Sequence, residues 1–124
     1  MTAPTAPTVN ELVLSDATGV WAVRSAGQTV YFIDADSMLL LRAAGAESSP
    51  GPGDGRWCPL VEVRSLFGGD AGVIRVGDRH RYLYDWDPGG ADYGFWIQRL
   101  VTSIDYVEAE ELAALPTFPQ DDPL

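Results

Sequence analysis

The chain has 124 residues with 8 basic and 18 acidic side chains, so its formal net charge is −10. This length accommodates one domain, the charge excludes a general binder of the nucleic-acid phosphate backbone, and a single cysteine excludes an internal disulfide. No apolar run approaches the roughly 18 residues of a membrane span, and the first residues lack the pattern of a secretory signal. We therefore expect a cytoplasmic protein that binds neither membrane nor nucleic acid.

The first ten residues (1–10) contain a Thr-Ala-Pro run without an apolar face, which predicts a flexible N-terminal arm. Residues 11–115 have the pattern of a single β-rich domain. Its first segments, 20–25, 29–34 and 38–42, show period-two patterning and are separated by short turns. This arrangement is typical of antiparallel strands, so the three segments predict a meander.

Two-residue turns at 26–27 and 35–36 would place Val23 opposite Val30 and Phe32 opposite Leu39. One face of the meander would then collect apolar side chains as a core. This face consists of Trp21, Val23, Val30, Phe32, Leu39 and Leu41.

The opposite face of the meander is also apolar, whereas a face in contact with water should alternate to polar residues. Later segments of the same chain are one expected cover, and the surface of another chain is the alternative. The second interpretation makes this face a candidate partner-binding surface. Its residues are Val20, Tyr31, Ile33, Met38 and Leu40.

Glycine and proline interrupt the chain throughout 43–56, where no regular pattern is present. Loops of this length are uncommon inside compact domains and are usually functional or disordered. We expect a long flexible loop inserted in the domain.

Further strands are predicted at 60–66, 73–76, 79–86 and 93–107. Gly77-Asp78 is a hairpin signal, and pairing Ile74 with Tyr82 across that hairpin keeps one face apolar. The same register gathers the aromatic residues of one strand on one face, namely His80, Tyr82, Tyr84 and Trp86. The strand at 93–107 is long enough to bend, either at Gly94 or around Arg99.

Acidic residues begin the segment 108–115 and Pro116 ends it, which predicts a short helix. Residues 116–124 are expected to form an acidic tail that contains proline. The predicted fold is all-β and mainly antiparallel, a small β-barrel or sandwich of about seven short strands with one short C-terminal helix.

Catalytic groups are scarce in this sequence. His80 is the only histidine, and a Ser-His-Asp arrangement would have to use Ser65 or Ser103 without any supporting motif spacing. Cys58 has no second cysteine for a metal site or redox pair, so we interpret it as a small buried side chain. We predict no catalytic residues, no cofactor-binding residues and no metal ligands.

Asp85, Asp87 and Asp92 lie on a glycine-rich stretch, and oxygen ligands with Asp-x-Asp spacing suit calcium. The stretch departs from the EF-hand pattern, because it has no third ligand at the right step and no terminal glutamate. Aspartate, proline and glycine are also the ordinary residues of a hairpin loop. Calcium binding at these residues is left open.

The composition also indicates a source. All basic residues are arginine, and the 13 glycines and 9 prolines accompany a single asparagine, which is typical of a high-GC bacterium or its phage. We expect a non-catalytic protein-binding module, such as an acidic inhibitor, an immunity-type protein or an adaptor, whose partner is another protein or a second copy of itself. The alternatives are a structural subunit of a phage particle or secretion-type assembly and, third, a small ligand-binding barrel or enzyme.

Overall fold

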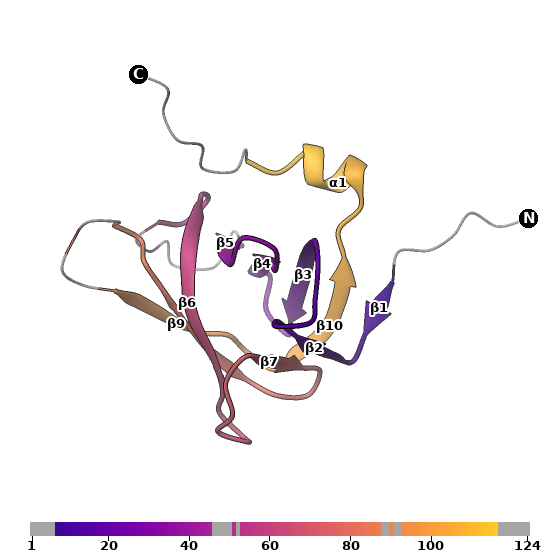
Figure 1. Cartoon of the computed structure of the whole chain (residues 1–124), viewed down its shortest axis with the longest axis vertical. Coiled ribbons are helices and arrows are strands. Elements are labelled where there is room, and N and C mark those ends of the chain that lie inside the picture. The colour runs from indigo at the N-terminus through magenta and orange to yellow at the C-terminus, as the bar shows by residue number, and fades with distance from the viewer. Residues whose placement is uncertain (1–6, 46–50, 52, 88–89, 91–92, 117–124) are drawn as a thin grey trace, which may run out of the picture.

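The computed structural model describes residues 7–45, 51, 53–87, 90 and 93–116. Within these residues the fold is all-β and antiparallel, with ten strands and one short helix (Figure 1). The elements are β1 (Thr8–Val9), β2 (Glu11–Val13), β3 (Val20–Ser25), β4 (Val30–Asp34), β5 (Leu39–Ala43), β6 (Trp57–Ser65), β7 (Val73–Arg75), β8 (His80–Tyr84), β9 (Gly94–Ile97), β10 (Val101–Tyr106) and α1 (Ala109–Ala113).

Eight of these strands form one open sheet in the order β1-β10-β3-β4-β5-β6-β8-β9, and β2 pairs with β7 in a separate two-stranded sheet. The predicted all-β class is confirmed, whereas the large sheet is not a closed barrel. The bend expected around Arg99 is also present, because β9 ends at Ile97 and β10 begins at Val101. The helix in the described part of the chain is not long enough to cross a membrane.

The meander of β3, β4 and β5 is confirmed, but the predicted register of its first hairpin is wrong. Val23 lies opposite Tyr31 rather than Val30, because the turn contains one more residue than predicted. The N–H of Ala26 donates to the carbonyl of Leu100 (3.1 Å), so Ala26 is held by the link between β9 and β10. The longer turn thus occurs together with a contact to a distant segment, and the local sequence pattern does not predict this contact.

The second turn of the meander is also longer than predicted. The Asp34 carboxylate accepts the N–H groups of Asp36 (3.0 Å) and Ser37 (3.3 Å), which gives a four-residue connection. Leu41 therefore lies opposite Phe32 in place of Leu39. The shift is by two residues, so the side chains of β5 keep their predicted faces relative to β4. The one-residue shift of the first hairpin nevertheless divides the predicted core face: Trp21 and Val23 belong to one buried cluster, and Val30, Phe32, Leu39 and Leu41 to the other.

Each face of the meander is covered by other parts of the same chain. Tyr31, Ile33 and Leu40 are buried in an interior cluster with side chains from β6, β8 and β10, and Met38 packs partly buried against it. Val20 belongs to a second cluster on the other face, which Leu112 and Leu115 cover from the helical segment. The candidate partner-binding residues thus lie on two faces of the meander, and all of them except Met38 are buried.

The predicted hairpin between 73–76 and 79–86 is wrong. Strand β7 pairs with β2, which places Leu12 opposite Ile74, while β8 lies between β6 and β9. The hydrogen bond between β7 and β8 is one to a side chain, in which the N–H of Arg75 donates to the imidazole Nε2 of His80 (3.1 Å). On the expected aromatic face, Tyr82 and Tyr84 are nevertheless buried in the interior cluster, and Trp86, which follows β8, packs partly buried against it. His80 is also buried.

Several predicted segments lie partly outside the described residues. In the arm 1–10, residues 1–6 are not described, whereas Thr8 and Val9 form β1 and pair with β10. In the loop 43–56, residues 46–50 and 52 are not described. In the tail 116–124, only Pro116 is described, and its carbonyl accepts the indole N–H of Trp57 (2.9 Å).

Candidate binding site

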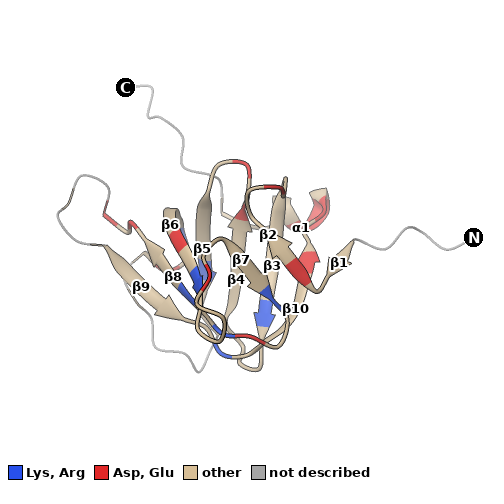
Figure 2. Ribbon diagram, turned by 60° about the horizontal axis from the view of Figure 1, so that its bottom comes forward, with Lys and Arg blue, Asp and Glu red and all other residues tan. Residues whose placement is uncertain are grey.

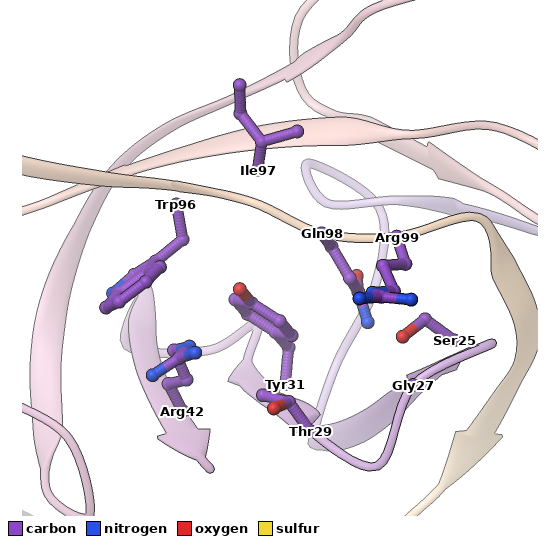
Figure 3. A pocket seen from close by; sticks show the side chains of 9 residues that line it. All are labelled: Ser25, Gly27, Thr29, Tyr31, Arg42, Trp96, Ile97, Gln98 and Arg99. Carbon is purple, nitrogen blue, oxygen red and sulfur yellow. The ribbon is translucent and has the colours of Figure 1, made fainter. Parts of the chain in front are cut away.

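A pocket of about 160 Å³ lies between β9 with its link to β10 on one side and the ends of β3, β4 and β5 on the other (Figure 3). Figure 3 shows that Trp96 and Arg42 approach it from one end, and Gln98, Arg99 and Ser25 from the other. The lining residues are Ser25, Gly27, Thr29, Tyr31, Arg42, Trp96, Ile97, Gln98 and Arg99.

Arg42 and Trp96 form one wall of this pocket. The guanidinium carbon of Arg42 lies 3.5 Å from the centre of the Trp96 ring, a cation–π contact, and the residue is only 8% exposed. The indole N–H of Trp96 donates to the hydroxyl of Tyr84 (2.8 Å), which fixes the ring. The wall is therefore built by three strands, β5, β8 and β9.

Arg42 is also paired with a carboxylate from the long loop. Its Nη1 donates to Asp54, whose side chain is 12% exposed and also accepts the N–H of Gly51 (2.8 Å). The N–H of Gly55 donates in turn to the carbonyl of Arg42 (3.0 Å). Because these bonds join the described end of the 43–56 loop to β5, this part of the loop belongs to the site.

The floor of the pocket is a chain of buried hydrogen-bonding groups. The Tyr31 and Tyr82 rings stack with centroids 4.7 Å apart, and the Tyr82 hydroxyl donates to Oε1 of Gln98 (2.6 Å). The Nε2 of Gln98 donates to the carbonyl of Val23 (2.9 Å), which ties the bend after β9 to β3. Burial raises the pKa of Tyr82 well above its usual value, and burial also raises that of Tyr31 although Arg42 opposes the shift. Both phenols stay neutral, so the floor supplies fixed dipoles.

Arg99 stands at the exposed rim of the pocket. It packs over Gly27, where an added Cβ would lie 3.3 Å from Cδ of Arg99. Within the described residues no carboxylate lies within ion-pair distance of Arg99. Counting only the residues that the structure describes there, Arg42 and Arg99 are positive and Asp54 is negative. Figure 2 shows that α1, which lies on the opposite side of the molecule from β9, has acidic but no basic residues.

Strand β9 beside the pocket is the last strand of the eight-stranded sheet. Gln98 donates its N–H to the carbonyl of His80 (3.1 Å), and hydrogen-bonded pairs alternate along an antiparallel ladder. The main-chain groups of Trp96 therefore face β8, and those of Phe95 and Ile97 face the edge of the sheet, where no strand of the described residues pairs with β9. Their side chains are exposed as well, by 59% for Phe95 and 43% for Ile97.

The structure brings Ser65, Asp78 and His80 together, but in an order that does not activate the serine. The Ser65 hydroxyl donates to Asp78 Oδ2 (2.5 Å) and accepts the N–H of Gly68 (2.8 Å). His80 Nε2 already accepts the N–H of Arg75, and it lies 3.5 Å from Asp78 Oδ2. A catalytic triad needs the imidazole between serine and carboxylate, whereas here the carboxylate lies between the other two.

This cluster instead joins two turns inside the protein. All three side chains are at least nine-tenths buried, and the Asp78 carboxylate also accepts the N–H groups of Phe67 (3.3 Å) and Arg79 (2.7 Å). Burial lowers the pKa of His80, although the nearby Asp78 opposes the shift. The other serine considered, Ser103, lies on β10 opposite Arg24.

The structure also shows the surroundings of Cys58 and of two aspartates that the sequence offers as calcium ligands. Cys58 is 3% exposed, and burial raises the pKa of its thiol, in agreement with a buried side chain. The N–H of Asp87 donates to Asp85 Oδ1 (3.2 Å), as in an ordinary Asx turn, while Asp92 lies outside the described residues. In the part of the chain that is described, no three His, Cys, Asp or Glu side chains are grouped as metal ligands would be.

The pocket residues Arg42, Trp96, Gln98 and Arg99 were not predicted from the sequence. One signal was present, because Arg42 interrupts a strand of leucines, and a charged side chain at such a position is normally paired. Comparison with protein-family models, with curated proteins and with solved structures finds no match for this chain.

Proposed function

We propose that this protein is a non-catalytic binding module that takes up an extended segment of another protein as an additional strand along the free edge of β9. The observation that carries the proposal is the exposed, apolar edge of β9 beside a pocket. Strand addition would use the outward main-chain groups of Phe95 and Ile97 for affinity and the neighbouring pocket for specificity.

Edge strands usually carry features that prevent pairing with other chains, such as lysine, proline or inward-pointing charge. Strand β9 reads Gly-Phe-Trp-Ile and has none of them, while β1 at the other edge has two residues only. Tyr93, next to β9, is 57% exposed and extends the apolar strip. Burying an apolar side chain of this size contributes about 1.5–3 kcal/mol, before the cost of ordering the incoming segment.

The test is a selection of peptide segments on the full-length protein, followed by NMR of the complex. We expect the amides of Phe95 and Ile97 to become protected from hydrogen exchange, and Phe95→Thr to weaken binding at least tenfold. Phe67→Thr is the matched control, because Phe67 is 68% exposed and belongs to the turn after β6 rather than to β9. Both variants retain the melting temperature of the parent.

Two results would contradict this function. Peptides that bind Phe95→Thr as well as the parent, with the amides of Phe95 and Ile97 unprotected, would place recognition elsewhere. A dimer in analytical ultracentrifugation that Phe95→Thr abolishes would make a second copy of the chain the occupant of the edge.

A further inference from the structure

We propose that the pocket beside β9 receives one carboxylate side chain, Asp or Glu, from the segment that adds to this strand. The inference rests on the proposed function and specifies its partner as an extended segment with an acidic residue. It is the opposite of what the net charge of −10 suggests for the partner as a whole.

The position of the pocket beside β9 supports this proposal. The pocket is lined by consecutive residues from Trp96 to Arg99 on one side and by the ends of β3, β4 and β5 on the other. A segment that pairs with the outward groups of Phe95 and Ile97 runs along the mouth of this pocket. Since side chains alternate along a strand, at least one residue of the segment points into it.

The charged side chains that line the pocket also favour a carboxylate. The two charged side chains among the described lining residues are Arg42 and Arg99, although acidic residues outnumber basic ones in the chain. Asp54 pairs with Arg42, and Arg99 has no ion-pair partner in the described residues, so one carboxylate would balance the charge of Arg99. The acidic helix α1 lies on the far side, and charges beyond about 8 Å are largely screened at physiological ionic strength.

The size and polarity of the pocket also suit a carboxylate side chain. A volume of about 160 Å³ equals roughly five water molecules at about 30 Å³ each, which suits a carboxylate with its short stem. Ser25 brings a hydroxyl next to Arg99 in Figure 3, and the guanidinium is planar and matches a carboxylate with two parallel hydrogen bonds. Arg42 is held by Trp96 and Asp54 before any ligand arrives, which reduces the entropic cost of binding.

The experiment uses the tightest peptide from the selection above, resynthesised with Glu, Gln, Asp or Asn at each position in turn, and isothermal titration calorimetry. We expect one position at which the acid binds at least tenfold more tightly than its amide. Arg99→Gln should reduce this ratio to about one, and Arg99→Lys should restore part of it. Arg81→Gln is the matched control, because Arg81 lies on neighbouring β8, carries the same charge and does not line the pocket.

The outcomes separate the two proposals. If binding depends on Phe95 but no position distinguishes acid from amide, the carboxylate pocket is refuted and strand addition stands. If the acid preference survives in Arg99→Gln, or is lost equally in Arg81→Gln, the pocket assignment is likewise refuted. If no segment binds through Phe95 at all, the proposed function itself fails.

Discussion

Trp96 covers the guanidinium of Arg42, whose carbon lies 3.5 Å from the ring centre, and the two residues that form this wall of the pocket come from β9 and β5. The contact joins the edge strand β9 to β5, with which β9 has no shared ladder. The same guanidinium is paired through Nη1 with the carboxylate of Asp54. The rigidity of the pocket therefore depends on a buried ion pair.

Removing one partner of that ion pair is expected to be costly. Arg42→Leu leaves the Asp54 carboxylate without its cation in a mostly buried position, so the free energy of unfolding should fall by about 3–5 kcal/mol. The double variant Arg42→Leu with Asp54→Leu should recover much of the loss. Urea denaturation of the single and double variants measures both values.

The matched control is Arg24→Leu, whose ion pair with Asp105 is about one-third exposed. Such pairs contribute about 0–1 kcal/mol, so this variant should remain close to the parent. Equal losses for Arg24→Leu and Arg42→Leu would contradict the special role of the Arg42 pair.

Burial of His80 predicts a pH dependence of stability. Burial lowers the pKa of His80 in the folded protein below its value in the unfolded chain, which is about 6.5. As the pH falls below that value, the unfolded state therefore binds a proton at His80 more readily than the folded state does. The free energy of unfolding should therefore fall as the pH is lowered from 7.5 to 5.5. In His80→Gln this part of the dependence should disappear, and an unchanged slope would show that another group causes it.

Ser65→Ala should be destabilising although it removes one atom. The substitution deletes the hydroxyl that donates to the Asp78 carboxylate and accepts the N–H of Gly68, and hydrogen bonds to charged groups contribute about 1.5–3 kcal/mol. Ser103→Ala on β10 is the comparison, with an expected change below about 0.5 kcal/mol. Thermal unfolding followed by circular dichroism distinguishes the two, and similar melting temperatures would contradict the structural role of the cluster.

Ile33→Asp tests whether the second face of the meander is internal. Ile33 is completely buried, so the carboxylate would lie in the interior cluster without a partner, and the chain should unfold at room temperature. Val61→Asp, at a side chain that is 45% exposed, should remain folded. A folded Ile33→Asp protein with an altered oligomeric state would instead show that another chain covers this face.

The parts of the fold that local patterns determine were predictable from the sequence. Strand β3 has the predicted bounds because period-two alternation is interrupted by glycines on both sides, at Gly19 and Gly27. The register of the first hairpin was not predictable, since the donor of Ala26 is taken by Leu100, far along the chain. The partner of β7 was missed for the same reason, because the short β2 has too few residues to show a pattern.

The candidate site was less accessible to sequence reasoning than the fold. Arg42, Trp96 and Arg99 line one pocket only because the sheet brings β9 over β5, and no residue spacing in the sequence predicts that approach. Ser65, Asp78 and His80 show the converse. Their residue types allowed a Ser-His-Asp arrangement for which the sequence offers no motif spacing, and the direction of the hydrogen bonds identifies a structural cluster.

The pairing of β3 with β10 also determines when the protein can fold during its synthesis. Arg24 and Asp105, whose side chains hydrogen-bond across these strands, are 81 residues apart. A ribosome that adds roughly 5–20 residues per second needs about 4–16 s to make that interval. During this time the edge of β3 that later pairs with β10 has no partner. The sheet can therefore be completed on this side of β3 only after β10 has been synthesised.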